Sequence, residues 1–427
     1  MTLNRFRKLR HCLLVLSACG LGLPVLNAQS SVAKPGADAK PRLVGYFPQW
    51  GLYNDPQYTV QSLVTSGGAA TLDQLNYAQG FVTGGHCSIA DPNADLNYRF
   101  SSATSVDGSE DLPTQSFHGN LHQLVELKRK YPRLKIIISL EGRADAFAAD
   151  AQPDVRNAFV TSCVDLFLKG NFAPGISVPG LFDGIDVDWE YPHAPDAENY
   201  LALLTEFRRQ MDALRPGMLL TIAVGASPRM YAGTDFGAVI KLVDQVGLMT
   251  YDFNGPWSST TGFISPLLMT DHEGGTVDRS VQAYLTAGVP HGKLLVGLPF
   301  YGYGWRQVLE DNNGLFQEGL AIRGDRPYRT IAEMVPNSTV YRDPASQAPW
   351  LFDGDIFWTY EDPVSIRHKS EYINEQHLAG FMIWELGEDT PNAALLHAAH
   401  QGLTQIPTAR PATAALRPAA SSSTKIE

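Results

Sequence analysis

Short runs of apolar and β-branched residues recur along the chain and are separated by longer amphipathic segments. Near-continuous apolar runs are typical of parallel strands that are covered on both faces. We predict eight such strands: LVGYF (43–47), LNYAQGFV (75–82), LKIIISL (134–140), FDGIDVDW (182–189), LLTIAV (219–224), QVGLMTY (245–251), KLLVGLPF (293–300) and GFMIWEL (380–386).

The segments between the runs carry helical spacing. Within 198–214, Leu201, Leu204, Phe207 and Met211 recur on one side, which predicts an amphipathic helix. Eight strands alternating with helices predict an α/β fold, a (β/α)8 TIM barrel. A doubly wound open sheet is the alternative, because a strand count does not prove that the sheet closes.

A second helix is marked by the signals at its ends. Asp362 can cap it, Pro363 lies in its first turn, and Gly380 lies beyond its end. Before this helix, residues 301–361 show no clear strand–helix alternation, which predicts an insertion at about 306–348 on the active face of the barrel.

The two ends of the chain differ in composition from the barrel segment, 42–405. Residues 1–28 have a basic start, an apolar run and a small exit residue, the layout of a secretory signal peptide. Residues 29–41 read as a linker, and 406–427, rich in Pro, Ala and Ser, as a disordered tail. We expect a secreted protein, extracellular or periplasmic. The alternative is a lipoprotein anchored through Cys19, because LSAC resembles a lipoprotein processing box.

The net charge argues against some classes of partner, and the cysteine count limits the possible disulfides and metal sites. The formal net charge of −11 argues against nucleic acid and anionic membranes, and glycine and proline interrupt the only candidate membrane span. Beyond the signal segment, Cys87 and Cys163 either form one disulfide or remain free thiols, and they lack zinc-ligand spacing. We expect a monomer.

Carboxylates occupy every second position of the fourth predicted strand. Side chains alternate between the faces of a strand, so Asp186, Asp188 and Glu190 point one way while Trp189 points the other. In a closed barrel the three acids face the interior near the carboxyl ends of the strands, where catalytic groups collect. Buried unpaired acids cost stability, so three in series indicate a function.

The acid series fits proton transfer better than metal binding. A calcium loop needs a glycine at its sixth position and has no apolar residues between its ligands, so we predict no metal site. Crowded carboxylates raise one another's pKa, which makes the outermost acid, Glu190, the predicted proton donor and Asp188 a hydrogen-bond acceptor. Besides the proton donor, a glycosidase usually needs a second carboxylate on the opposite side of the sugar, which acts as nucleophile or base. Either Asp252 fills this place, or an N-acetyl group of the substrate does.

The segment DGIDVDWEYP resembles the DxxDxDxE pattern of family 18 glycoside hydrolases, the chitinase family, and the similarity extends over about residues 42–400. The other segments that carry it are GYFPQW (45–50), GLMTYDFNGPW (247–257), LLVGLPFYGYGW (294–305) and GFMIWELGED (380–389).

The resemblance implies a role for each matching acid. Glu190 would act as acid and then as base, Asp188 would hold the acetamido nitrogen, and Asp186 would pair with Asp188 deeper in the barrel. Asp183 would have a structural role at the start of the strand. Tyr251 would hydrogen-bond the acetamido oxygen. The product would keep its anomeric configuration through an oxazolinium intermediate, and no cofactor is implied.

The resemblance also implies the walls of the sugar site. Met249 and Asp252 would line the acetamido subsite, Trp384 would form the floor under the cleaved sugar, and Tyr46 would close the base. Independently, tryptophans gather at predicted strand ends, where aromatic faces can stack on sugars. Trp257 belongs to this set and is a candidate substrate-binding residue.

The third strand departs from the family pattern Ser-x-Gly-Gly-Trp. It reads SLEGR, so Ser139 is kept, Glu141 replaces a glycine, and Arg143 stands where a leaving-side tryptophan is expected. The insertion also reads as shorter than the α+β module of many chitinases, which suggests an open cleft and endo action. We predict hydrolysis of chitin or chitooligosaccharides. The alternatives are an endo-β-N-acetylglucosaminidase and a non-catalytic chitinase-like lectin.

Overall fold

The computed structural model describes residues 40–268 and 274–405. The predicted signal peptide, Cys19, all but the last two residues of the predicted linker and the predicted tail lie outside these residues. Within them, no helix is long and apolar enough to cross a membrane.

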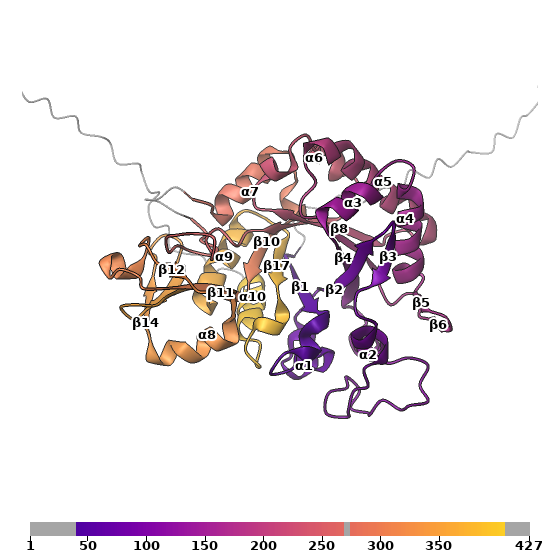
Figure 1. Cartoon of the computed structure of the whole chain (residues 1–427), viewed down its shortest axis with the longest axis horizontal. Coiled ribbons are helices and arrows are strands. Elements are labelled where there is room, and N and C mark those ends of the chain that lie inside the picture. Colours follow the sequence, from indigo (N-terminus) through magenta and orange to yellow (C-terminus); the bar gives the residue numbers. More distant parts are fainter. Residues whose placement is uncertain (1–39, 269–273, 406–427) are drawn as a thin grey trace, which may run out of the picture. The chain divides into compact units, whose positions relative to one another are not determined.

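Eight parallel strands close into a barrel (Figure 1). In order around the barrel they are β1 (Arg42–Pro48), β2 (Gln74–Thr83), β4 (Lys135–Glu141), β7 (Gly184–Asp188), β8 (Leu219–Gly225), β9 (Gln245–Met249), β10 (Leu294–Pro299) and β17 (Gly380–Trp384). Strand β1 pairs with both β2 and β17, so these eight strands form a closed ring. The closure confirms the predicted (β/α)8 barrel and excludes the open sheet.

Helices follow most of the barrel strands along the chain and cover the sheet. They are α1 (Val60–Thr65), α2 (Gly119–Lys130), α3 (Ala144–Asp150), α4 (Arg156–Cys163), α5 (Ala197–Leu214), α6 (Phe236–Val239), α7 (Val277–Thr286), α9 (Pro363–Glu375) and α10 (Ala394–Thr404). Helix α5 matches the predicted helix, and its Leu204, Phe207 and Met211 are fully buried.

Helix α9 begins at the predicted residues, Asp362 and Pro363, and it ends several residues before Gly380, the predicted end signal. The carboxylate of Asp362 accepts hydrogen bonds from the backbone N–H of Val364 and Ser365, at 3.0 and 2.9 Å. The helix ends at Glu375, and His377 takes the left-handed conformation that reverses the chain, with φ 53°. Gly380 instead begins strand β17.

The outer face of β7 follows the predicted alternation. Trp189 is 1% exposed and packs between Phe147 of α3 and Tyr200 of α5, with ring centroids 5.4 and 5.7 Å away. Nearby, Cys87 of β3 (His86–Ile89) and Cys163 at the end of α4 form a disulfide, which settles the open question about these thiols.

The segment between β10 and β17 is an α+β unit, larger than the predicted insertion at 306–348. Its elements are β11 (Tyr301–Arg306), β12 (Leu320–Ala321), β13 (Arg326–Pro327), α8 (Tyr328–Met334), β14 (Thr339–Arg342), β15 (Pro349–Phe352) and β16 (Phe357–Thr359). The sheet is antiparallel. Its strands are short, and glycine alternates with aromatic residues in β11. The sequence therefore contains no apolar run that would predict these strands.

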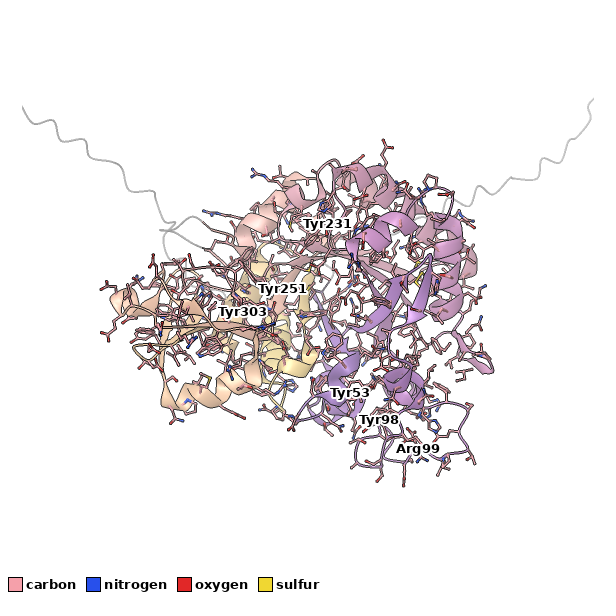
Figure 2. The ribbon with its side chains drawn as sticks, in the orientation of Figure 1. Tyr53, Tyr98, Arg99, Tyr231, Tyr251 and Tyr303 are labelled. Carbon is pink, nitrogen blue, oxygen red and sulfur yellow. A yellow bond between two sulfur atoms is a disulfide. The ribbon has the colours of Figure 1, made fainter. Side chains whose placement is uncertain are left out.

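The insertion shares a core with the barrel mouth. Tyr251, which follows β9, lies 6.2 Å from Tyr301 of β11, and Tyr301 lies 5.6 Å from Tyr303, measured between ring centroids. Figure 2 labels Tyr251 and Tyr303. Trp257 continues this row, 5.5 Å from Tyr303. The insertion therefore supplies one wall beside the ends of the barrel strands.

Candidate active site

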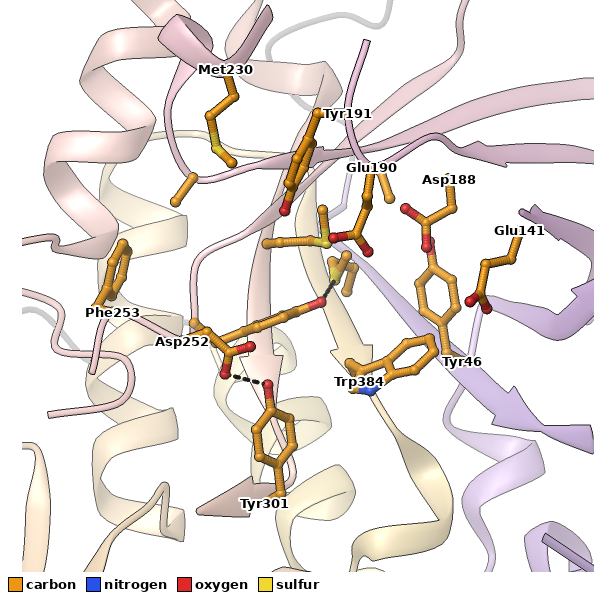
Figure 3. A pocket seen from close by; sticks show the side chains of 15 residues that line it. Tyr46, Glu141, Asp188, Glu190, Tyr191, Met230, Asp252, Phe253, Tyr301 and Trp384 are labelled. Carbon is orange, nitrogen blue, oxygen red and sulfur yellow. Dashed lines mark hydrogen bonds between the residues drawn. The ribbon is translucent and has the colours of Figure 1, made fainter. Parts of the chain in front are cut away.

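A pocket of about 360 Å³ lies at the carboxyl ends of the barrel strands (Figure 3). The structure brings seven of the predicted site residues together on its wall: Tyr46, Asp188, Glu190, Met249, Tyr251, Asp252 and Trp384. A single cavity with a few convergent polar groups on an otherwise apolar and aromatic lining is typical of a small-ligand site.

Asp186 lies below the pocket and is held by hydroxyl groups. Tyr46 donates to it at 2.7 Å, Ser139 donates at 2.9 Å, and Thr221 donates to its other oxygen. These hydrogen bonds oppose the increase in its pKa that burial causes. No hydrogen bond joins Asp186 to Asp188 within the described chain, so the two acids interact through charge alone.

Asp188 is the most perturbed acid of the pocket. It is 8% exposed, and its Oδ1 atom has no hydrogen-bond partner among the described residues. Burial raises its pKa well above the ordinary value, and the charges of Glu190, Asp186 and Glu141 raise it further. Burial and the like charges around Asp188 therefore favour its protonated form.

Glu190 follows β7 and reaches the open part of the pocket. Its carboxylate is accessible to solvent through the mouth, yet the protein around it removes enough water to raise its pKa. A hydrogen bond from Tyr191 lowers that pKa, and the charge of Asp252 raises it again. A carboxyl group that holds its proton toward neutral pH can serve as a general acid.

The hydroxyl of Tyr251 faces the same space as Asp188. Its contact within the described chain is the sulfur of Met382, at 3.9 Å, which is a weak acceptor. The pocket therefore presents an acceptor, Asp188 Oδ1, and a donor, Tyr251 Oη, neither of which has a strong partner. An amide group carries the complementary N–H and C=O.

Aromatic rings form the floor of the pocket. Trp384 lies 5.5 Å from the ring of Tyr46 and 6.2 Å from that of Trp50, both measured between centroids. On another wall, Tyr301 donates a hydrogen bond to Asp252 at 2.7 Å. Flat apolar surfaces beside a few fixed polar groups suit a sugar ring, which has apolar faces and a polar edge.

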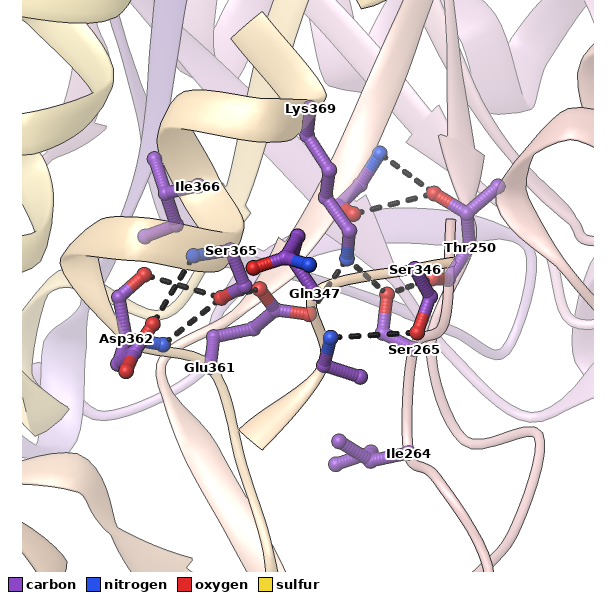
Figure 4. Close-up of polar contacts among 12 residues, drawn as sticks. Thr250, Ile264, Ser265, Ser346, Gln347, Glu361, Asp362, Ser365, Ile366 and Lys369 are labelled. Atoms are coloured by element: carbon purple, nitrogen blue, oxygen red, sulfur yellow. Dashed lines mark hydrogen bonds and ion pairs between the residues drawn. The ribbon is translucent and has the colours of Figure 1, made fainter. Parts of the chain in front are cut away.

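A buried ion pair supports the backbone next to Tyr251 (Figure 4). Lys369 of α9 pairs with Glu361 and donates to Ser265 at 2.6 Å. Ser265 in turn donates to the carbonyl oxygen of Thr250 at 2.6 Å. This chain of contacts fixes the residue that immediately precedes Tyr251.

Besides Asp186, two more of the predicted residues lie outside the pocket. Asp183 accepts hydrogen bonds from Lys128 Nζ at 2.6 Å and from the Ile136 N–H at 3.0 Å, at the opposite end of β7. Trp257 is 62% exposed, packs edge-on against Tyr303 and does not line the cavity.

The structure also separates Glu141 from Arg143. Glu141 lines the pocket beside Asp188, whereas the side chain of Arg143 is 81% exposed and pairs with Asp145 at 2.8 Å. Sequence reasoning named Glu141 only as a departure from a pattern. Strand alternation could have found it, because Glu141 is two residues after the inward-facing Ser139.

The remaining lining residues, which the sequence did not reveal, come from strands, loops and one short 3-10 helix. Ala223, Tyr301 and Met382 lie on β8, β11 and β17, Met230 lies in the 3-10 helix Pro228–Tyr231, and Tyr191, Ala226 and Phe253 lie in loops. No group of His, Cys, Asp and Glu able to hold a metal ion occurs in the described ranges.

Comparison with known proteins gives a consistent result. Residues 42–389 match the family model "Glycosyl hydrolases family 18". Chitinase C of Streptomyces lividans is 34% identical over 377 residues, which are 84% of this chain and 59% of that protein. The chain thus spans about three fifths of the length of the first curated relatives it matches.

Solved structures share the fold. The catalytic domain of the psychrophilic chitinase B from Arthrobacter TAD20 has a TM-score of 0.79 and 29% identity, and the match covers 85% of this chain and 95% of that one. A family 18 N-acetylglucosaminidase from Paenibacillus barengoltzii has a TM-score of 0.67 and 29% identity, with 85% and 99% covered.

Proposed function

The chain belongs to the family 18 glycosyl hydrolases, and from that membership we propose that it hydrolyses β-1,4-linked N-acetylglucosamine in chitin or chitooligosaccharides. The observation that carries the proposal is a pair of polar atoms in the pocket: Asp188 Oδ1, which has no partner among the described residues, and Tyr251 Oη, whose contact is the weak acceptor Met382 Sδ. They match the N–H and C=O of a 2-acetamido group on a sugar that lies over Trp384.

The proposed reaction uses the substrate as its own nucleophile. Glu190 gives its proton to the glycosidic oxygen while the acetamido oxygen attacks the anomeric carbon, which releases the leaving sugar and forms an oxazolinium ion. The Asp188 carboxylate stabilises the positive charge that develops on the ring nitrogen. Glu190 then removes a proton from water, which opens the ring, so two inversions retain the configuration.

Asp252 is the alternative nucleophile or base, and its contacts favour the acetamido route. Asp252 already accepts a hydrogen bond from Tyr301, whereas Asp188 Oδ1 lacks a partner in the described part of the chain. The presence of Glu190, Asp188 and Tyr251 in one pocket also favours an enzyme over a lectin, since a lectin needs no proton donor.

The test is hydrolysis of chromogenic chitooligosaccharides by the purified protein, with and without an oxazoline-mimicking inhibitor. Cleavage that the inhibitor blocks supports both the substrate and the acetamido mechanism. Cleavage that the inhibitor leaves unchanged would reject the mechanism and return attention to Asp252.

We also propose that the protein is exported. The basic and apolar start of the sequence has the layout of a signal peptide. The disulfide between Cys87 and Cys163 supports export, because disulfides persist in oxidising compartments. Detection of the cleaved protein outside the cytoplasm tests this part of the proposal.

A further inference from the structure

Glu141 places a fourth carboxylate in the pocket, next to the reacting groups. It is the last residue of β4, and its register partner on β7 is Asp188. Register partners in a parallel pair point to the same face, so Glu141 faces the barrel mouth as Asp188 does. In Figure 3 its carboxylate lies beside Asp188 and Tyr46, on the opposite side of the pocket from Phe253 and Tyr301.

The protein does not neutralise this carboxylate. Glu141 is half-buried and has no hydrogen-bond or ion-pair partner among the residues that the structure describes. Arg143, the nearby cation in the sequence, turns to solvent and pairs with Asp145. Four acids line the pocket, Glu141, Asp188, Glu190 and Asp252, and the lining contains no lysine, arginine or histidine.

Three of these four acids have a place in the proposed reaction. Glu190 transfers the proton, Asp188 holds the acetamido group, and Asp252 is engaged by Tyr301. Glu141 has no such task, and its repulsion of Glu190 and Asp188 costs free energy in the empty site. A positive group on the ligand would relieve that repulsion and form a charge-assisted hydrogen bond.

We propose that Glu141 binds the free ammonium group of a glucosamine unit that adjoins the cleaved N-acetylglucosamine, so that partly deacetylated chitin is the preferred substrate. This inference rests on the proposed function. The cleaved sugar must keep its acetamido group, because that group is the nucleophile. The ammonium group therefore belongs to a neighbouring sugar, within reach of a side chain that borders Asp188.

A hydroxyl group of the sugar is the competing ligand for Glu141. The substitution Glu141→Gln separates the two cases, since the amide still accepts a hydrogen bond from a hydroxyl but carries no charge. Asp145→Asn is the matched control. It also removes one negative charge from the same region, but Asp145 is 67% exposed and does not line the pocket.

The experiment digests a partly deacetylated chitosan and a fully acetylated chitohexaose with the wild type, Glu141→Gln and Asp145→Asn. The fragments are sequenced by mass spectrometry to find the sugars on both sides of the cut. We expect the wild type and Asp145→Asn to select glucosamine at a flanking position about tenfold over its abundance, as one charge-assisted bond allows. Glu141→Gln should lose this selection, and high salt should weaken it in the wild type.

The outcomes separate the two proposals. Equal flanking-sugar frequencies in the wild type and Glu141→Gln, with chitohexaose still cleaved, would overturn the role of Glu141 and leave the proposed function standing. If the wild type fails to cleave chitohexaose, the proposed function itself is rejected. Unchanged folding of Glu141→Gln, judged by its circular dichroism and melting temperature, excludes misfolding as the cause of lost selection.

Discussion

Glu190 carries the proposed chemistry, and its replacement gives the sharpest prediction for a single residue. Glu190→Gln keeps the size of the side chain but cannot give a proton, so kcat should fall by about 10²- to 10⁴-fold. The Kd for chitooligosaccharides should stay near the wild-type value, because Trp384, Asp188 and Tyr251 remain in the pocket. Calorimetry and initial rates measure the two quantities. A variant that retains turnover would show that another group is the acid.

The neighbours of Glu190 should move the pH profile in opposite directions. Burial raises the pKa of Glu190, the hydrogen bond from Tyr191 lowers it, and the charge of Asp252 raises it. The acid must be protonated, so activity is lost as the pH rises through this pKa. Asp252→Asn should therefore move the alkaline limb of kcat/KM to lower pH, and Tyr191→Phe should move it to higher pH. Shifts in the same direction would contradict this assignment.

Strand alternation explains which site residues the sequence could reveal. It correctly predicted that Trp189 points away from the barrel interior and that Asp188 points toward the pocket. The same alternation places Glu141 on the inward face of the third strand with Ser139, but Glu141 was not predicted as a lining residue. Loop residues such as Tyr191 and Phe253 could not be found in this way, because loops have no fixed side-chain period.

At the scale of elements, the disulfide ties strand β3 to helix α4. It joins residues separated by 76 positions, and closing a loop of this length in the unfolded chain is worth about 4 kcal/mol in the chain-entropy model. The double variant Cys87→Ala/Cys163→Ala should lose roughly that much free energy of unfolding in urea titrations. Its kcat should change little, since neither residue lines the pocket. Equal stability of the variant and the wild type would contradict a formed disulfide.

The sequence predicted the barrel strands but not the strands of the insertion. The barrel strands are buried on both faces, so their apolar runs marked all eight. Strands β12 and β13 have two residues each, and β11 places glycine between its aromatic residues, which leaves no run to recognise. The insertion could therefore be located from the sequence, but its α+β structure could not.

For the whole molecule, the buried acid Glu385 near the barrel mouth should make the free energy of unfolding depend on pH. Burial raises the pKa of Glu385 to about 8; the charge of Arg329 lowers it and that of Asp325 raises it. A carboxyl group with a raised pKa stabilises the fold fully below its ordinary pKa, and this contribution is lost as the pH rises through about 8. The shift from 4.5 to about 8 corresponds to about 5 kcal/mol.

Glu385→Gln removes this titration while keeping a neutral side chain of the same size. The melting temperature of the wild type should fall between pH 5 and pH 8.5, and the fall should be smaller in the variant. Calorimetry at the two pH values measures both. A wild type whose stability rises over this range, or a variant with the same pH dependence, would contradict the burial of an uncompensated carboxyl at this position.

In the proposed mechanism, the acetamido group of the substrate replaces a second catalytic carboxylate. The most direct measurement is the anomeric configuration of the new reducing end, observed by proton NMR in the first minutes of chitohexaose hydrolysis, before mutarotation. We expect the β-anomer to form first, because two inversions at the same carbon retain the configuration. Initial formation of the α-anomer would mean direct attack by water with a carboxylate base, and would contradict substrate-assisted catalysis.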